Sequence, residues 1–180
     1  MLDVAQNSIS AGASLIEIEI LRDTAEHKLF IGIYDNGCGM TEEQTRQVMD
    51  PFFTTRTTRK VGMGIPLFKL AAEQTGGSLE IESEVGKGTR VKTVFNTDSI
   101  DFTPLGDINS TIITLITMNT DRDFIYTFGI DNKKFILSTS ELKSILGGVP
   151  LSEPEVAAWI KDYIEEQTEN ICGGVIIENT

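Results

Sequence analysis

A carboxylate stands between an apolar run and two glycines in the segment Asp35-Asn-Gly-Cys-Gly-Met40. The apolar run, residues 29–34, predicts a buried strand that delivers Asp35 at its end. Gly37 and Gly39 let the backbone turn tightly after this strand and let a flat ligand come close to the carboxylate. This arrangement can recognise the edge of a planar base. A turn of Asp, Asn and Gly has the same composition without any ligand, so the segment alone leaves both interpretations open.

Three further segments carry polar or glycine-rich chemistry in a fixed order around this one. They are Asp3-Val-Ala-Gln-Asn-Ser8, Pro51-Phe-Phe-Thr-Thr-Arg56 and Gly62-Met-Gly-Ile65. The four segments resemble the N, G1, F and G2 boxes of the GHKL superfamily, whose ATP-binding domains occur in DNA gyrase B, MutL, heat-shock chaperones and histidine kinases. Four boxes in order within about 65 residues argue against a chance match.

The resemblance covers residues 2–96 and implies a fold and ligands. The implied fold is α/β, an α+β two-layer sandwich of the Bergerat type, over residues 1–98. The implied ligands are ATP and Mg²⁺. The order Pro-Phe-Phe-Thr-Thr before Gly-x-Gly is most similar to histidine kinases.

Matched position by position, the resemblance assigns Mg²⁺ coordination to Asn7 and recognition of the adenine amino group to Asp35. Asp3 matches the general base of the hydrolysing members, where Glu is usual, and its shorter side chain could cost about 10²-fold in rate. Asp and Asn near a helix start also act as caps, which leaves the role of Asp3 open. The other implied nucleotide contacts are Gly37, Gly39, Met40, Phe53, Thr54, Thr55, Arg56, Lys60, Gly62, Met63, Gly64, Ile65 and Thr89.

The segment from Pro51 to Ala72 contains no acidic residue, although the chain is acidic overall. Its Arg, Lys and Thr side chains suit a polyanion such as a nucleotide triphosphate. We expect this segment to form the lid over the phosphates, with a solvated basic loop as the alternative. Gly62-x-Gly64 then opens a helix whose free backbone amides can bind phosphate.

Hydrophobic periodicity predicts the elements that position these residues. A first helix over residues 2–13 places Leu2, Ala5, Ile9 and Ala13 on one face. A later helix that begins near Gly64 places Leu67, Leu70 and Ala71 inward. The other elements expected in this half are strands at 15–21, 28–34, 78–83 and 89–95, the last two as a hairpin, and a helix at 42–49 with a capping box at Thr41.

Residues 96–106 have linker composition, so we expect a second, small α+β domain of unknown role over residues 107–180. Strands are expected at 108–118, 124–130 and 135–137, and helices at 139–146 and 154–167. Capping boxes are expected at Ser138 and Ser152. An apolar stripe on the last helix packs in the core or in a partner's groove, and it consists of Val156, Trp159, Ile160, Tyr163 and Ile164.

Composition excludes several classes of function. A net charge of −12 argues against a nucleic-acid surface and an anionic membrane surface. Neither a long apolar run nor a signal pattern is present, and the two cysteines, Cys38 and Cys172, form no disulfide framework. We therefore expect a cytoplasmic protein, with His27 in a polar turn. Met1 directly precedes the first helix, which leaves open whether the N-terminus is truncated. The sequence also leaves the oligomeric state open.

Three functions follow from these observations. The first is a histidine kinase-type catalytic domain that binds Mg-ATP and phosphorylates a partner protein in trans. The second is an ATP-dependent conformational switch or slow ATPase acting through its C-terminal domain, since Asn7-Ser-Ile-Ser-Ala-Gly-Ala13 is similar to MutL-type ATPases. The third is a serine kinase of the anti-sigma type. Each involves a protein partner, which we expect to bind the C-terminal domain.

Overall fold

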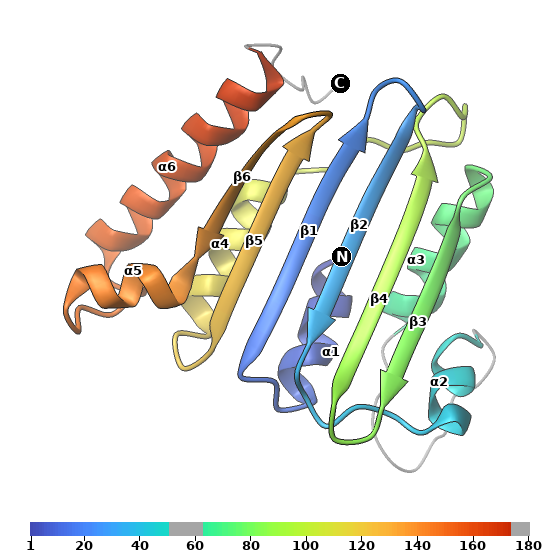
Figure 1. Ribbon diagram of the computed structural model, residues 1–180, viewed down its shortest axis with the longest axis horizontal. Coiled ribbons are helices and arrows are strands. Elements are labelled where there is room, and N and C mark those ends of the chain that lie inside the picture. The colour runs from blue at the N-terminus through green and yellow to red at the C-terminus, as the bar shows by residue number, and fades with distance from the viewer. Residues whose placement is uncertain (51–62, 174–180) are drawn as a thin grey trace.

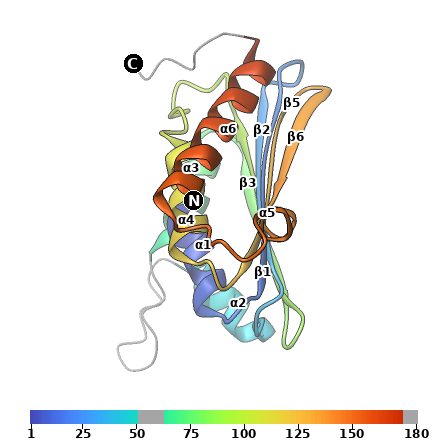
Figure 2. The same cartoon turned by 90° about the vertical axis from the view of Figure 1, so that its left-hand side faces the viewer.

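The computed structural model describes residues 1–50 and 63–173, which form a sheet with helices packed on one of its faces (Figures 1 and 2). The strands are β1 (Leu15–Asp23), β2 (Lys28–Asp35), β3 (Ser78–Glu84), β4 (Gly88–Asn96), β5 (Asp123–Ile130) and β6 (Lys133–Ser138). The helices are α1 (Leu2–Ser10), α2 (Glu42–Val48), α3 (Gly64–Gln74), α4 (Ile108–Met118), α5 (Thr139–Leu146) and α6 (Pro154–Cys172). The predicted α/β two-layer architecture is confirmed.

The strands form one sheet in the order β3-β4-β2-β1-β5-β6. Strand β1 lies antiparallel to β2 and parallel to β5. Along β1, Ile16, Ile18 and Ile20 are buried under the helices, whereas Glu17 and Glu19 point to the other face. This alternation is the one that the sequence predicts, and Figure 2 shows that the face bearing the glutamates carries no layer of helices.

The two halves of the chain share this sheet. Strand β5 pairs with β1 from Leu15 opposite Asp123 to Arg22 opposite Ile130. The segment with linker composition therefore runs between strands of one sheet. The division into domains over 1–98 and 107–180 stays a prediction, and backbone hydrogen bonds cross it.

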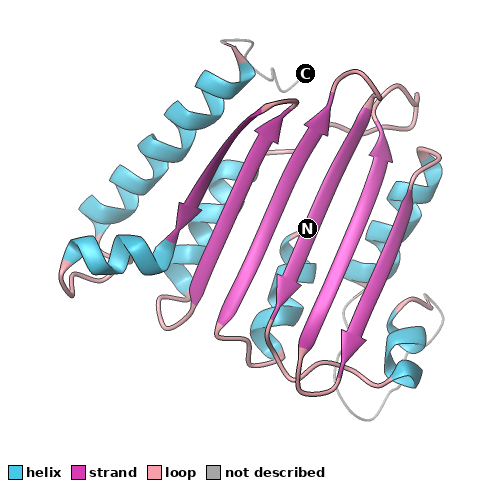
Figure 3. Cartoon of the chain, in the orientation of Figure 1, coloured by secondary structure: helices cyan, strands magenta, loops and turns pink. Residues whose placement is uncertain are grey.

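Residues 108–118 form helix α4, so the prediction of a strand there is wrong (Figure 3). Their many β-branched side chains favour a strand by propensity, but Ile112, Leu115 and Ile116 are buried at helical spacing. Asp107 caps the helix by accepting a hydrogen bond from the Ser110 amide at 2.9 Å. The threonine hydroxyls bond to carbonyls one turn back, as at Thr114, where the distance to the Ser110 oxygen is 2.7 Å.

Helix α3 faces the sheet with a different set of residues from the predicted one. Ile65 and Ala72 are buried and Phe68 packs against the core. Leu67 and Leu70 are 53% and 51% exposed, so the prediction that they point inward is wrong; Ala71 is exposed as well. This helix is apolar on several sides, and periodicity alone did not identify its buried face.

Helix α1 is also shorter and rotated relative to the prediction. It ends at Ser10 instead of residue 13, and its buried residues are Val4, Ala5 and Ser8. Leu2 was expected on the buried face but is 45% exposed. The inward position of Ser8, a polar residue on the stripe that faces the sheet, matters for the site described below.

Of the three predicted capping boxes, the one at Thr41 forms in full and the one at Ser138 forms as a single cap bond. Thr41 forms the predicted capping box with Gln44, and the Ser138 hydroxyl accepts a bond from the Glu141 amide. Helix α6 instead begins after Glu153, without a side-chain cap, so the cap predicted at Ser152 is wrong. In α6, Ile160 and Ile164 are fully buried, whereas Trp159 is half exposed and stacks on Tyr163 with ring centroids 5.4 Å apart.

Ile18→Ala is expected to destabilise both halves of the chain together. Ile18 is 2% exposed on β1, between β2 and β5, and such a truncation costs about 2–5 kcal/mol. The fluorescence of Trp159, the sole tryptophan, reports on the C-terminal half during urea unfolding. The urea midpoint measured by Trp159 fluorescence should shift by as much as the midpoint measured by far-ultraviolet circular dichroism.

Ile136→Ala on β6, where the side chain is 55% exposed, is the control and should change the free energy of unfolding by about 0.5 kcal/mol or less. An unchanged Trp159 transition in Ile18→Ala would contradict the shared core.

Candidate functional site

A row of polar side chains interrupts the apolar, helix-facing side of the sheet at one end. Asp35 on β2 stands opposite Thr89 on β4, which in turn stands opposite Ser83 on β3. The hydroxyls of Ser83 and Thr89 are 2.9 Å apart. The next row along the same strands is apolar, with Ile33, Val91 and Ile81. A polar row beneath the helices is costly unless it is hydrogen-bonded, so its partners define what the site can do.

The Asp35 carboxylate is held by one hydrogen bond on each oxygen. The Ser8 hydroxyl of α1 donates to one oxygen at 2.7 Å, and the Gly37 amide donates to the other at 2.9 Å. A carboxylate offers about four acceptor positions, so two positions are left by the described residues for a ligand that donates. Ser8 is 4% exposed and was not predicted as a site residue, although its polarity on the buried stripe of α1 is a signal for such a role.

Gly37 and Gly39 are required by the packing of the chain on itself. A Cβ at Gly37 would lie 2.9 Å from the Ala11 oxygen, and one at Gly39 would lie 2.0 Å from the Glu84 oxygen. Gly39 also has a φ of 64°, which favours glycine. These close approaches explain both glycines without a ligand, and their role as nucleotide contacts stays a prediction.

Asn36 fastens the turn to the loop that follows α1. Its side-chain oxygen accepts hydrogen bonds from the amides of Ser14 and Leu15, both at 2.9 Å, and its side-chain nitrogen donates to the Ser14 hydroxyl. The Cys38 amide donates to the Ala11 oxygen at 3.0 Å. Asn36 was not predicted as a site residue. These bonds fix the position of α1 relative to Asp35.

Asp3 and Asn7 lie on α1, and Asp3 reaches the beginning of α3. A Cβ at Gly64 would lie 2.5 Å from the Asp3 Cβ and 3.3 Å from one of its carboxylate oxygens. The structure therefore brings the first and last of the four sequence segments together. The Asn7 side chain, half buried, has no hydrogen bond to any other residue within the described ranges.

The remaining predicted nucleotide contacts differ in how far they are buried. Met63 is 61% exposed before α3, whereas Ile65 is 4% exposed and packs in the core. Met40 packs partly against the core, and its amide donates to the Ser83 hydroxyl at 2.8 Å. The other predicted contacts lie outside the described residues, and they are Phe53, Thr54, Thr55, Arg56, Lys60 and Gly62.

In residues 1–50 and 63–173, no cluster of three or more His, Cys, Asp or Glu side chains could hold a metal ion by itself. Mg²⁺ commonly takes one or two protein ligands and completes its shell with phosphate oxygens and water. Asn7 suits this kind of site. Its side-chain amide oxygen is a hard ligand, and it accepts no hydrogen bond from another described residue.

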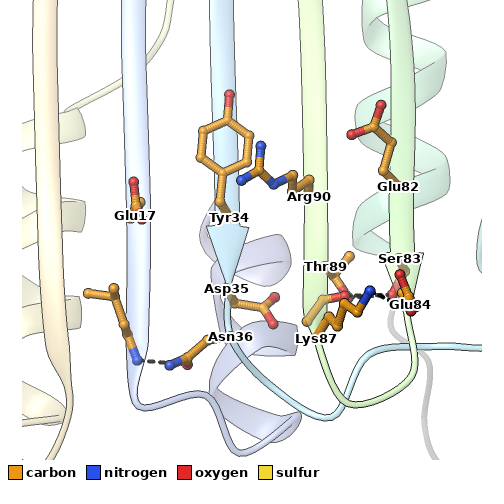
Figure 4. Close-up of a pocket in the computed structure, with 12 residues that line it drawn as sticks. Glu17, Tyr34, Asp35, Asn36, Glu82, Ser83, Glu84, Lys87, Thr89 and Arg90 are labelled. Carbon is orange, nitrogen blue, oxygen red and sulfur yellow. Dashed lines mark hydrogen bonds and ion pairs between the residues drawn. The ribbon is translucent and has the colours of Figure 1, made fainter.

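A cavity of about 440 Å³ lies at the same end of the sheet but opens on the face without helices (Figure 4). Tyr34 and Arg90 line it and alternate with the buried Ile33 and Val91 along their strands. Of the predicted contacts, Asp35 and Thr89 alone line it within the described part of the chain. The Ser8–Asp35 bond lies on the other side of the sheet, so the two sites share Asp35 and Thr89 but open on opposite faces.

Tyr34 in this cavity is held by charged neighbours. Its hydroxyl donates to Glu19 at 3.1 Å, and the Arg90 guanidinium lies over its ring, 5.5 Å from the centroid. Burial and the nearby Glu19 carboxylate raise the pKa of Tyr34 to about 12. The tyrosine is therefore a neutral hydrogen-bond donor at physiological pH.

Residues 1–99 match the model of the histidine kinase-, DNA gyrase B- and HSP90-like ATPases. The chain belongs to this ATPase family. Among its relatives are a putative sensor protein of Shewanella frigidimarina, 31% identical over 98 residues, and the sensor protein SrrB of Staphylococcus aureus, 41% identical over 78 residues. These matches cover 53% and 41% of this chain, but 15% and 13% of the relatives. The predicted family resemblance is confirmed.

The ATPase-family chain is also similar to a solved structure, the N-terminal domain of a DNA repair protein. The TM-score is 0.46 at 18% sequence identity, and the similarity covers 76% of this chain and 50% of the other. Among the described helices, none combines the length and the apolar character needed to cross a bilayer.

Gly39→Ala is expected to destabilise this ATPase-family chain by about 1–3 kcal/mol more than Gly86→Ala. Both glycines have positive φ, but a Cβ at Gly86 meets no atom within 4 Å, whereas one at Gly39 overlaps the Glu84 carbonyl. The comparison isolates the overlap from the backbone strain. Urea unfolding of both variants measures it, and equal losses of stability would show that the approach of Gly39 to Glu84 is not required.

Proposed function

We propose that the chain binds Mg-ATP on the helix-facing side of β2 and acts as a histidine kinase-type catalytic domain, with its phosphoacceptor on another protein. The observation that carries the proposal is the position of the Asp35 carboxylate. Ser8 and Gly37 each donate one hydrogen bond to it, and the described residues leave its other acceptor positions unused. The exocyclic amine of adenine is a donor that fits these positions. Membership of an ATPase family over residues 1–99 supports the assignment.

The N-terminus of α3 supports a site for the phosphates near Asp35. Met63 precedes α3 without a side-chain cap, and the amides of a first helical turn are free to bind an anion. Asn7 lies on α1, the helix that contacts this end of α3 through Asp3. We assign Asn7 to Mg²⁺, which would neutralise phosphate charge and orient the phosphates.

His27, the sole histidine of the sequence, lies far from the proposed phosphate site. His27 lies in the exposed turn between β1 and β2, and it is 3.0 Å from Asp98. Asp35 lies at the other end of β2, an eight-residue strand, which places it roughly 25 Å away. A phosphoryl group held near α3 would not reach this histidine within one chain.

An apolar stripe next to the proposed phosphate site suits the protein that carries the acceptor. Met63, Leu67 and Leu70 recur at helical spacing along α3 and are all more than half exposed. Exposed apolar groups that cluster in this way mark protein interaction sites. We assign the partner to this stripe and not to the C-terminal half, where the sequence analysis expects it, because a partner docked on α3 would bring its acceptor to the beginning of that helix.

A second candidate function is a slow ATPase that works as a conformational switch. It is favoured by the approach of Asp3 to Gly64, which places a carboxylate at the beginning of α3, where a general base for water would stand. The two functions differ in the need for this carboxylate. Phosphotransfer to another protein does not use Asp3 to activate water, whereas hydrolysis does.

Mg-ATP binding by the full chain tests the proposed function. Asp35→Asn is expected to weaken binding at least about tenfold, because it removes the charge that accepts from the adenine amine. Asp131→Asn is the matched control, since Asp131 also accepts two hydrogen bonds, both from Thr24 at 2.8 Å, but lies at the other end of the sheet. Calorimetry should show unchanged affinity for the control. Equal affinities for Asp35→Asn and the unaltered chain would refute the site.

Asp3→Asn separates the two candidate functions. If Asp3 activates water, phosphate release from Mg-ATP should fall about 10²-fold or more while Mg-ATP affinity is retained. The exposed Asp101→Asn is the control and should change neither quantity. Unchanged phosphate release in Asp3→Asn would contradict the role of Asp3 as a base and leave the kinase as the supported function.

A further inference from the structure

A second cavity, of about 450 Å³, lies at the end of the sheet opposite Asp35, on the side covered by helices. It is lined by the end of β1, the beginning of β2, the end of β5, the segment 102–109 and the last turns of α6. These elements surround the upper end of the sheet in Figure 1. Its volume lies within the range of about 300–1,000 Å³ that is typical of small-molecule sites.

The floor and one wall of this cavity are apolar. Ile20, Leu29 and Phe128 form the floor, and they are 1%, 5% and 7% exposed. Phe102 and Leu105 contribute the wall and pack partly against the core. A ligand that fills the cavity must therefore present an apolar body to these side chains, since desolvated polar groups would have no partners there.

Arg22, an exposed residue near the end of β1, adds a positive charge to the lining of the apolar cavity. It follows Ile20 by two residues on β1, so both side chains lie on the helix-facing side. Its guanidinium takes part in no hydrogen bond or ion pair with another described residue, although it interacts electrostatically with Asp131 and Cys172. A guanidinium is shaped to bind a carboxylate through two parallel hydrogen bonds.

Two of the three acidic side chains that line the cavity already have partners. Asp107 accepts from the amide and the hydroxyl of Ser110, at 2.9 and 2.6 Å, and these bonds lower its pKa. Glu165 pairs with Lys161 at 3.7 Å. The third, Glu169, is exposed on α6. Arg22 is thus the charged group of the lining that is best placed to select a ligand.

The helix-facing side of β5 also carries a hydroxyl without a partner among the described residues. Tyr126 precedes Phe128 by two residues on the same face of β5, is 1% exposed, and its hydroxyl has no hydrogen-bond partner in the described structure. Burial, and secondarily the Cys172 thiol, raise the pKa of Tyr126, and Cys172 itself lines the cavity. A polar atom of a ligand or a water would supply the partner that this buried hydroxyl lacks.

We propose that this cavity binds a small amphiphilic carboxylate, with its aliphatic or aromatic body on Ile20, Leu29 and Phe128 and its carboxylate on Arg22. The site is separate from the proposed nucleotide site. Both halves of the chain contribute to it, because β1 and β2 come from one half and β5 and α6 from the other. It gives the C-terminal half a binding role that does not depend on ATP.

Calorimetric titration of the full chain with octanoate, octanol and octylamine tests this proposal. The three probes share one apolar chain and differ in charge. Octanoate should bind at least about tenfold more tightly than octanol, and octylamine should bind most weakly. Arg22→Gln should abolish the preference for octanoate, and Arg22→Lys should keep part of it, because a lysine retains the charge without the bidentate geometry.

Arg90→Gln, which removes a guanidinium from the opposite face of the sheet, is the matched control and should bind octanoate like the unaltered chain. Several outcomes would overturn the proposal: no binding of any probe, equal binding of octanoate and octanol, tighter binding of octylamine, or an Arg22→Gln variant that still prefers octanoate. Binding that occurs only in a chain ending at Gly173 would also overturn it, because residues 174–180 would then be the competing occupant.

Discussion

The arrangement of the candidate nucleotide site depends on one hydrogen bond, from the Ser8 hydroxyl to the Asp35 carboxylate at 2.7 Å. It joins the buried face of α1 to the end of β2, at the point where the helix-facing side of the sheet changes from apolar to polar. Because Ser8 is fixed on a helix and Asp35 at the end of a strand, the carboxylate has a defined direction. The position of α1 then decides where Asn7 and Asp3 lie relative to α3.

The C-terminal half contributes to this geometry from a distance. Arg122 donates a hydrogen bond to the Ala13 carbonyl, and the Asp123 amide donates to the Ser14 carbonyl at 2.8 Å. Lys143 in turn binds the Arg122 carbonyl and the Asp123 carboxylate, at 2.7 and 2.8 Å. The loop after α1 is therefore held from one side by Asn36 and from the other by β5. Residues 107–180 extend the sheet and also support the loop on which the site rests.

Local chemistry in the sequence predicted much of this structure. The alternation of Glu17 and Glu19 with isoleucines identified β1 and its uncovered face, and the carboxylate after an apolar run identified Asp35. Helix α4 was missed because its β-branched residues favour a strand, and burial at helical spacing together with the Asp107 cap outweighs that propensity. The outward face of α3 and the pairing of β1 with β5 depend on contacts between distant segments, which periodicity does not encode. The glycines after Asp35 were predicted, but the structure explains them by contacts with Ala11 and Glu84.

The central claim is that ATP occupies the helix-facing side of the sheet at Asp35. The amide NMR spectrum of the chain, titrated with Mg²⁺ and a non-hydrolysable ATP analogue, tests it most directly. If ATP binds there, large shifts are expected for Ser8 on α1, Gly37 in the turn and Gly64 at the beginning of α3. Shifts confined to Glu82 and Arg90, which line the cavity on the uncovered face, with α1 and α3 unchanged, would contradict it.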